Sequence, residues 1–285
     1  MRKRLVVGFF LFLLALIFIT GCVTKTSDID LPLVEMSQFS PHLETLKARY
    51  DLTETLKTTK MTVTIQETGR NPEELREFLW YKRSTDGNDL LRVQALGPFN
   101  DTKVVAIANR NEFLLSLLDE QETYFGKLSD GVLRNIFRID LRVSDILSAI
   151  FANPFLDGRT EKLKITGLAP KFFINRAGVE AGHTEIITIL VRDGEPRVTE
   201  WGINDKDGLL QQSVVFEDYR EVDGILRPHK VEIERPLEQT RVVVRMAKVQ
   251  LNIEIDDSRF DFEPFLTEDM KIMPFSELEE TDVSE

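Results

Sequence analysis

Apolar and polar residues alternate along most of the chain from residue 59 onward. Met61, Val63 and Ile65 are interleaved with threonine and glutamine, which is the period of a strand with one face in water. Explicit turns such as Asp193-Gly194 and Asp223-Gly224 separate neighbouring segments, so the pattern predicts an antiparallel meander. Further strands are expected at residues 76–83, 89–96, 102–109, 112–118, 121–126, 162–167, 170–175, 184–192, 196–203, 209–217, 229–235 and 240–255.

Two segments follow a helical period instead. Leu43, Leu46 and Tyr50 place one apolar stripe on a helix near residues 41–57, with Ser40-Pro41 as its N-cap and first residue. A second, short helix is predicted over residues 146–151 and is ended by a proline. Because an amphipathic helix needs a surface to cover, both helices should lie on the sheet.

A meander of ten or more strands does not stay flat, so it must curl or split. We therefore predict an α+β fold that is mainly β: a curled antiparallel half-barrel closed by a few helices around an apolar cavity. For any single residue, an ordinary filled core is the competing interpretation. The concave face would be lined by Phe78, Trp80, Leu91, Val93, Ala95, Val105, Ile107, Phe113, Leu115, Leu117, Ile187 and Ile189.

The first 22 residues follow neither pattern. Residues 2–4 are basic, and the uncharged apolar run at residues 5–19 follows them, which is the layout of a secretory signal. The run is shorter than the roughly 20 residues that a permanent membrane helix needs. Its end, Ile19-Thr20-Gly21-Cys22, resembles the lipobox of bacterial lipoproteins. This resemblance implies that residues 1–21 are a cleaved signal peptide and that Cys22 carries the lipid anchor.

The chain beyond the signal divides into three parts. Residues 22–39 read as a lipidated tether, and residues 40–266 as the half-barrel domain. Acidic side chains dominate residues 267–285, where only Lys271 opposes them, which is typical of a solvated and disordered tail.

Composition narrows the range of functions. The chain has 36 Lys+Arg against 48 Asp+Glu and a formal net charge of −12, so nucleic acid is a poor partner. Its single cysteine excludes an intrachain disulfide. His42, His183 and His229 are scattered, and neither a metal site, a cofactor motif nor a catalytic motif is visible. The sequence therefore predicts a binding protein and not an enzyme.

Three stretches resemble the LolA/LolB-like superfamily of envelope lipoprotein carriers and receptors. Residues 91–99, followed by Tyr124-Phe125-Gly126-Lys127, resemble the front half of LolB-type outer-membrane receptors. Residues 216–229 resemble a segment shared by LolA-like carriers, and residues 260–265 resemble the closing strand of that superfamily. The resemblance implies a half-barrel whose apolar cavity accepts the acyl chains of lipoproteins or lipids.

The same resemblance implies a role for Phe99, which stands where the LolB loop carries an exposed apolar residue that enters the outer membrane. Asn100 occupies a place where that loop often has glycine, and a Phe99 folded back on the sheet is the alternative. Val23 follows Cys22, and the absence of aspartate there favours the periplasmic face of the outer membrane under the sorting rule of Gram-negative lipoproteins.

Two functions follow from these observations. The first is an outer-membrane-anchored carrier or acceptor that binds acyl chains of lipoproteins or lipids in an apolar cavity. The second is a structural or assembly lipoprotein with a filled cavity that binds another envelope protein, for example along a sheet edge. A cavity of several hundred Å³ would favour the carrier, and a packed interior would favour the scaffold.

Overall fold

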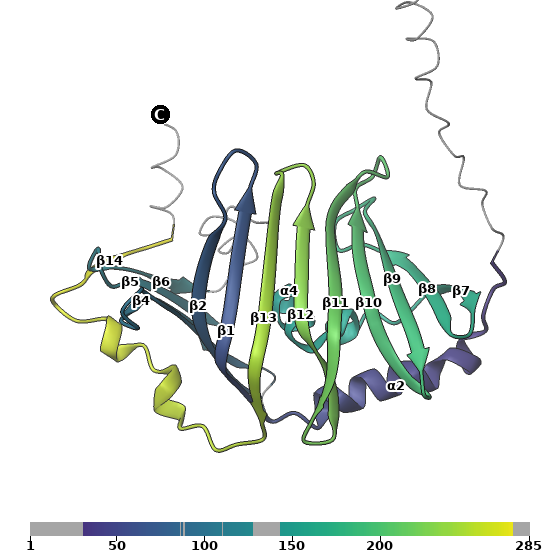
Figure 1. Ribbon diagram of the computed structural model, residues 1–285, viewed down its shortest axis with the longest axis horizontal. Helices are drawn as coiled ribbons and strands as arrows, with labels where there is room; N and C mark the ends of the chain where they lie inside the picture. The colour runs from purple at the N-terminus through teal and green to yellow at the C-terminus, as the bar shows by residue number, and fades with distance from the viewer. Residues whose placement is uncertain (1–30, 86, 88, 110, 128–142, 276–285) are drawn as a thin grey trace, which may run out of the picture. The chain divides into compact units, whose positions relative to one another are not determined.

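The computed structural model describes residues 31–85, 87, 89–109, 111–127 and 143–275. The predicted signal peptide, Cys22 and most of the tether lie outside the described residues, and so do residues 276–285 of the tail. Residues from Pro32 onward belong to one unit built around a single fourteen-stranded sheet. The prediction of a mainly β, curled antiparallel sheet is confirmed (Figure 1).

Two meanders make up this sheet. The first runs through β1 (Thr55–Glu67), β2 (Glu73–Lys82), β3 (Leu90–Leu96), β4 (Thr102–Asn109), β5 (Glu112–Leu117) and β6 (Glu122–Lys127). The second runs through β7 (Lys164–Leu168), β8 (Lys171–Ala177), β9 (Thr184–Arg192), β10 (Glu195–Asn204), β11 (Leu210–Val222), β12 (Ile225–Arg235) and β13 (Thr240–Leu251).

The first and last long strands join the two meanders. β1 pairs antiparallel with β13, from Leu56 opposite Leu251 to Glu67 opposite Thr240. β1 and β13 are both long, and the irregularity in their register lies near Lys60. Since this pairing links residues nearly 200 positions apart, the sheet is complete only after the whole domain has been made.

The sheet is not closed, and each of its edges is covered by a short segment from near a chain end. β14 (Lys271–Met273) adds a parallel strand to β6. At the other edge, Leu33 bridges to Thr166 of β7, and the Val34 N–H donates to the Ile165 carbonyl at 3.0 Å. These segments satisfy backbone groups that would otherwise be exposed at the edges.

Helix α2 (Met36–Asp51) runs along one end of the strands, and α4 (Val143–Phe151) lies against the sheet (Figure 1). Helix α2 begins earlier than predicted, with Pro41 inside it, because Phe39 upstream of the proline is fully buried in the core. The helix also ends earlier, since β1 starts at residue 55. Among the described residues, no helix is both long and apolar enough to cross a bilayer.

The two faces of the sheet carry separate apolar clusters. The larger cluster joins α2 and α4 to one face, which includes Met61, Leu79, Trp201 and Met246. The smaller cluster lies on the opposite face of β2–β6, and residues 253–266 cover it. Phe260 at the centre of that cover is fully buried.

The C-terminal part of the chain differs from the prediction in two ways. Residues 260–265, expected as a closing strand, instead follow η2 (Asp257–Phe260) and form η3 (Glu263–Phe265), two 3₁₀ turns packed on the sheet. The prediction of a disordered tail is wrong for residues 267–275, because β14 pairs with β6 and Phe275 is buried against Phe113. The prediction followed the many acidic residues of this segment, although a few apolar residues attach it to the sheet.

Candidate functional site

An apolar pocket lies between α4 and the face of the sheet that carries the larger cluster. Its volume is about 160 Å³. An apolar cavity of about 150 Å³ in another protein holds a benzene ring, so the pocket has room for one ring-sized group. The lining comes from α4 and seven strands: Met61, Val63, Glu77, Leu79, Val93, Ile146, Ala149, Ile150, Trp201, Gln212, Val214, Val231, Ile233, Val244 and Met246.

Glu77 is the one ionisable residue in that lining. It lies on β2 between Leu75 and Leu79 on the same face, opposite Met61 of β1 and Ala95 of β3. Burial among these apolar neighbours raises the pKa of its carboxyl group to about 7. The carboxyl group therefore changes its charge near neutral pH.

Gln212 and Trp201 supply the other polar atoms of the lining. Gln212 is 4% exposed and Trp201 1% exposed. The indole N–H of Trp201 does not point to a ligand, because it donates to Oε2 of Glu185 at 3.0 Å. The flat face of Trp201 is thereby fixed as a wall of the pocket.

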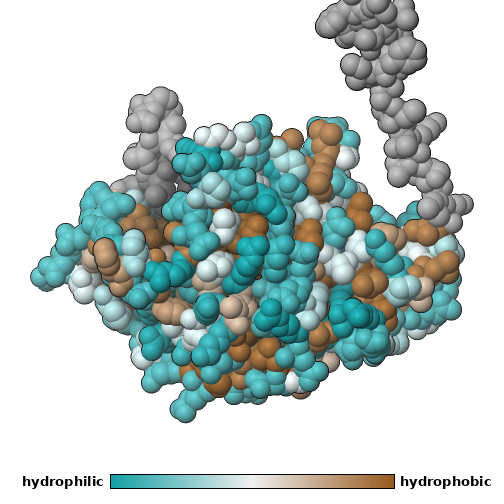
Figure 2. Space-filling model, viewed as in Figure 1, coloured by the Kyte–Doolittle hydropathy of each residue, from teal (hydrophilic) through white to brown (hydrophobic). Residues whose placement is uncertain are grey.

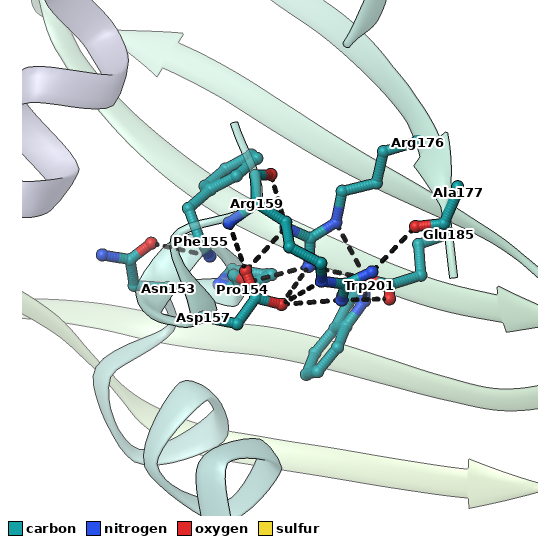
Figure 3. Close-up of polar contacts among 9 residues, drawn as sticks. All are labelled: Asn153, Pro154, Phe155, Asp157, Arg159, Arg176, Ala177, Glu185 and Trp201. Atoms are coloured by element: carbon teal, nitrogen blue, oxygen red, sulfur yellow. Dashed lines mark hydrogen bonds and ion pairs between the residues drawn. The ribbon is translucent and has the colours of Figure 1, made fainter. Parts of the chain in front are cut away.

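A buried ion-pair cluster holds Trp201 from behind (Figure 3). Arg176 on β8 donates to Glu185 on β9 at 2.7 Å, and both side chains are 2% exposed. Asp157 is the last residue of η1 (Pro154–Asp157), and Arg159 lies two residues later. With Glu185 and Arg176 they make a cluster of two carboxylates and two guanidinium groups. Burial would raise the pKa of Asp157, but hydrogen bonds from Arg159 and the charge of Arg176 bring it below its usual value.

The same cluster fixes the chain directly after α4. Arg176 donates to the Pro154 carbonyl at 2.8 Å, and the Asn153 side chain donates to the Leu46 carbonyl of α2 at 3.3 Å. The ring of Phe151 packs edge-on against Tyr50 and Tyr81, at centroid distances of 5.0 and 4.9 Å. The C-terminal end of α4 is thus attached to both the sheet and α2.

A buried arginine also contacts this end of α4. Arg227 on β12 donates to the Ile150 carbonyl at 3.1 Å, which suits a cation at a helix C-terminus. Burial lowers the pKa of its guanidinium group to about 10. Arg227 contacts two lining residues, Ile150 and Met246, without lining the pocket itself.

The twelve residues predicted to share the concave face are divided between the two faces. Phe78, Trp80, Val105 and Ile107 belong to the smaller cluster under residues 253–266. The other eight lie on the face of the sheet that carries the larger cluster: Leu91, Val93, Ala95, Phe113, Leu115, Leu117, Ile187 and Ile189. Within this second group, Val93 lines the pocket. The prediction placed Phe78 and Trp80 on the wrong face of β2, because β2 is apolar on both faces and alternation does not distinguish them.

The prediction missed most residues that do line the pocket. Met61 and Val63 were recognised as apolar strand positions, but nothing in a local pattern shows that β1 pairs with β13. Glu77 carried a usable signal, because it is a lone acid in the Leu75, Glu77, Leu79 series. Gln212 gives the same signal on β11, where it is a polar residue on the same face as Val214 and Phe216.

Phe99 lies at the tip of the β3–β4 hairpin and is 90% exposed. The Gly97 N–H donates to the Asp101 carbonyl at 2.8 Å, and Asn100 adopts a φ of 64°, a conformation that asparagine tolerates. Asparagine therefore supplies the left-handed residue of the turn, and Phe99 points away from the sheet.

The central strands present a polar surface on the face opposite α4. Lys230 of β12 pairs with Glu217 of β11, and Glu232 pairs with Arg241 of β13. In Figure 1 α4 lies behind β12, and Figure 2 shows that the surface in front of these strands is largely hydrophilic. Across the described residues, no group of three or more His, Cys, Asp and Glu is arranged to hold a metal ion.

Comparison with known proteins identifies the fold. No protein-family model matches the chain, and no curated protein matches its sequence. A DUF1329 family protein from Desulfovibrio piger is similar in structure, with a TM-score of 0.58 and 13% identity over 79% of this chain and 98% of that chain. A domain from Vibrio parahaemolyticus, assigned to outer membrane lipoprotein sorting, has a TM-score of 0.53 and 12% identity over 79% of this chain and 98% of that domain. The chain has the fold of these proteins.

A LolA superfamily protein from Nitrosomonas europaea is also similar, with a TM-score of 0.49 and 11% identity over 78% of this chain and 98% of that protein. The fold shared with the lipoprotein-sorting domain and the DUF1329 family protein agrees with the resemblance that the sequence indicated, at the level of the fold. In this fold, the pocket described above lies on the face that α4 covers.

Proposed function

We propose that this protein is a lipid-anchored carrier or acceptor of the bacterial envelope that binds acyl chains of lipoproteins or lipids in the pocket under α4. The observation that supports it most directly is the lining, in which thirteen of fifteen residues are hydrophobic. An acyl chain in water exposes apolar surface that costs about 25 cal/mol per Å². An apolar pocket lowers that cost without covalent chemistry, so the proposed role is binding and not catalysis.

The size of the pocket defines what it holds. Pockets for whole small molecules usually measure about 300–1,000 Å³. At about 160 Å³ the pocket is smaller than that range and smaller than the several hundred Å³ expected for a carrier. The interior is nevertheless not filled. We infer that it holds one end of a chain, with the remainder outside.

Membrane attachment through Cys22 completes this proposal. Each buried methylene of an attached acyl chain contributes about 0.8 kcal/mol, so two or more chains on one cysteine hold a protein on a membrane stably. The location we propose is the periplasmic face of the outer membrane. The Cys22→Ala variant should take up no fatty-acid analogue in metabolic labelling, and label that persists in that variant would contradict the anchor.

Filling the pocket tests the binding site. The described core lies within residues 33–275, so a chain that starts at residue 23 keeps every contact of both clusters. In that chain, Ala149→Phe adds a ring from α4 into the pocket and should weaken binding of a fluorescent fatty-acid analogue at least tenfold. The matched control is Ala181→Phe in an exposed turn, which should leave binding unchanged. Equal binding by both variants would show that the ligand sits elsewhere.

The alternative is an assembly lipoprotein that binds an envelope protein. Its simplest mode would add a partner strand to a free sheet edge. Residues 32–34 already cover β7, and β14 covers β6. This coverage favours the carrier. A folded, monomeric chain without saturable acyl binding would reverse that preference.

A further inference from the structure

The pocket contains one carboxyl group, and its lining supplies no cation to pair with it. Glu77 is the single ionisable group among the fifteen lining residues, which come from β1, β2, β3, α4, β10, β11, β12 and β13. Within the described part of the chain, its carboxylate has no hydrogen bond and no ion pair. An ionised carboxylate in apolar surroundings is costly unless a partner is supplied.

The nearby cations are directed elsewhere. Arg76, the neighbour of Glu77 on β2, donates to the carbonyl groups of Gly97 and Pro98 at 3.2 and 3.0 Å. Arg227 donates to the Ile150 carbonyl and contacts the Met246 sulfur at 3.9 Å. Burial alone raises the pKa of Glu77 and lowers the pKa of Arg227. The charge of one group therefore does not shift the pKa of the other.

We propose that the pocket selects amphiphiles whose head carries an ammonium or another hydrogen-bond donor next to the apolar chain, and that Glu77 is the residue that recognises it. The inference rests on the proposed function, because it concerns the end of the ligand that enters the same pocket. An ammonium group at Glu77 supplies the missing partner. A carboxylate or phosphate at the same place adds a second negative charge in a site of low dielectric.

Gln212 is the other polar side chain of the lining. It is 4% exposed, lines the pocket, and has an amide oxygen that can accept a hydrogen bond. Glu77 and Gln212 lie on β2 and β11, with β1, β13 and β12 between them. We therefore assign recognition of the ammonium group to Glu77 alone, and Gln212 can contact another part of the ligand.

Three probes with the same tail and different heads separate charge from chain. n-Octylamine, n-octanol and n-octanoate are soluble and carry one alkyl chain each. Trp201 lines the pocket and reports its occupancy by fluorescence, whereas Trp80 lies in the cluster on the opposite face and is replaced by phenylalanine to remove its signal. The full chain with Trp80→Phe is held in nanodiscs of one fixed lipid composition for all titrations.

At pH 8 we expect n-octylamine to bind at least tenfold more tightly than n-octanoate, with n-octanol between them. Adding Glu77→Gln should reduce this ratio below about threefold. The matched control is Glu74→Gln on the same strand, since Glu74 is exposed on the opposite face, and it should keep the full ratio. At pH 6, where Glu77 is mostly protonated, the ratio should shrink in the parent protein and stay constant in Glu77→Gln.

Two results would overturn the inference. If all three probes bind alike, or if n-octanoate binds best, selection by Glu77 is wrong while acyl binding in the pocket stands. If Glu77→Gln and Glu74→Gln change the ratio equally, the selectivity does not arise at Glu77. Failure of all three probes to change Trp201 emission would instead contradict the proposed function itself.

Discussion

The two halves of the sheet differ in what covers the face opposite the larger cluster. Strands β2–β6 are apolar on both faces, and residues 253–266 cover the face opposite the larger cluster. On strands β10–β13 the face opposite α4 carries ion pairs such as Glu217 with Lys230. The face under residues 253–266 is filled, whereas the face under α4, to which β1–β3 and β10–β13 both contribute, contains the pocket.

This difference separates stability from binding. In the β2–β6 half, Phe260 and Ile107 are fully buried between packed layers. Under α4, the interior keeps unfilled volume, and a buried ion-pair cluster fixes both Trp201 and the segment that follows α4. The fold thus has a filled face and a face that keeps space for the ligand that we propose.

The largest expected effect comes from breaking the buried ion-pair cluster. Glu185→Ala leaves Arg176 buried without its main carboxylate, and such a loss costs about 3–5 kcal/mol. Urea unfolding should show this decrease, together with a change in Trp201 emission because its indole N–H loses its acceptor. Glu195→Ala, which removes an exposed partner of Arg49, should cost less than about 1 kcal/mol. A similar loss in both variants would mean that the cluster does not stabilise this half.

A pair of milder substitutions contrasts the two halves directly. Phe260→Leu in the filled half and Val231→Ala in the pocket lining should each lower the free energy of unfolding by about 1–2 kcal/mol. Only Val231→Ala enlarges the pocket, so it alone should raise the affinity for n-decanol relative to n-octanol. If Phe260→Leu changes ligand affinity as much, the two halves are not independent.

Glu77 makes the stability of the fold depend on pH. Its pKa in the folded protein is about 7, against an ordinary value of 4.5. The folded state therefore binds more protons between these values, and stability decreases as pH rises from about 4.5 to 7. The difference of about 2.5 between these two pKa values corresponds to roughly 3 kcal/mol, so Glu77→Gln should match the parent at pH 4.5 and have a melting temperature higher by roughly 6–12 °C at pH 8. An equal difference at both pH values would contradict burial as the cause.

The smallest effect on stability is expected at Phe99, which belongs to neither interior. Phe99→Glu should change the free energy of unfolding by less than about 0.5 kcal/mol, because the side chain is 90% exposed. Acyl binding in solution should persist, while transfer to liposomes should weaken. Leu237→Glu, at an exposed position of the β12–β13 turn, is the control. Equal transfer by both variants would remove the membrane role of the β3–β4 hairpin.

Local chemistry made the strands predictable. The predicted bounds of β4 and β9 agree with the structure at both ends, and those of most other strands agree within a few residues. Turns such as Asp193-Gly194 and Asp223-Gly224 adopt positive φ values at both residues, which aspartate tolerates and glycine favours. Period and turn chemistry act over a few residues, and for that reason a sequence shows them.

The orientation of the faces was not local. β2 is apolar at Phe78 and Trp80 on one face and at Leu79 and Tyr81 on the other, so alternation alone could not choose between them. The choice depends on residues 253–266, more than 170 positions later, which cover Phe78 and Trp80.

The sequence by itself determined the mainly β class, the antiparallel meanders, the turn at residues 97–101 and the short helix over residues 146–151, because turn formers and apolar periods specify them within each segment. Tertiary structure decided that β1 pairs with β13, that residues 271–275 return to β6, and that Glu77, Gln212 and Trp201 meet in one pocket. These contacts join segments far apart in the chain. They form because covering both faces of a long curled sheet buries more apolar surface than any local arrangement can.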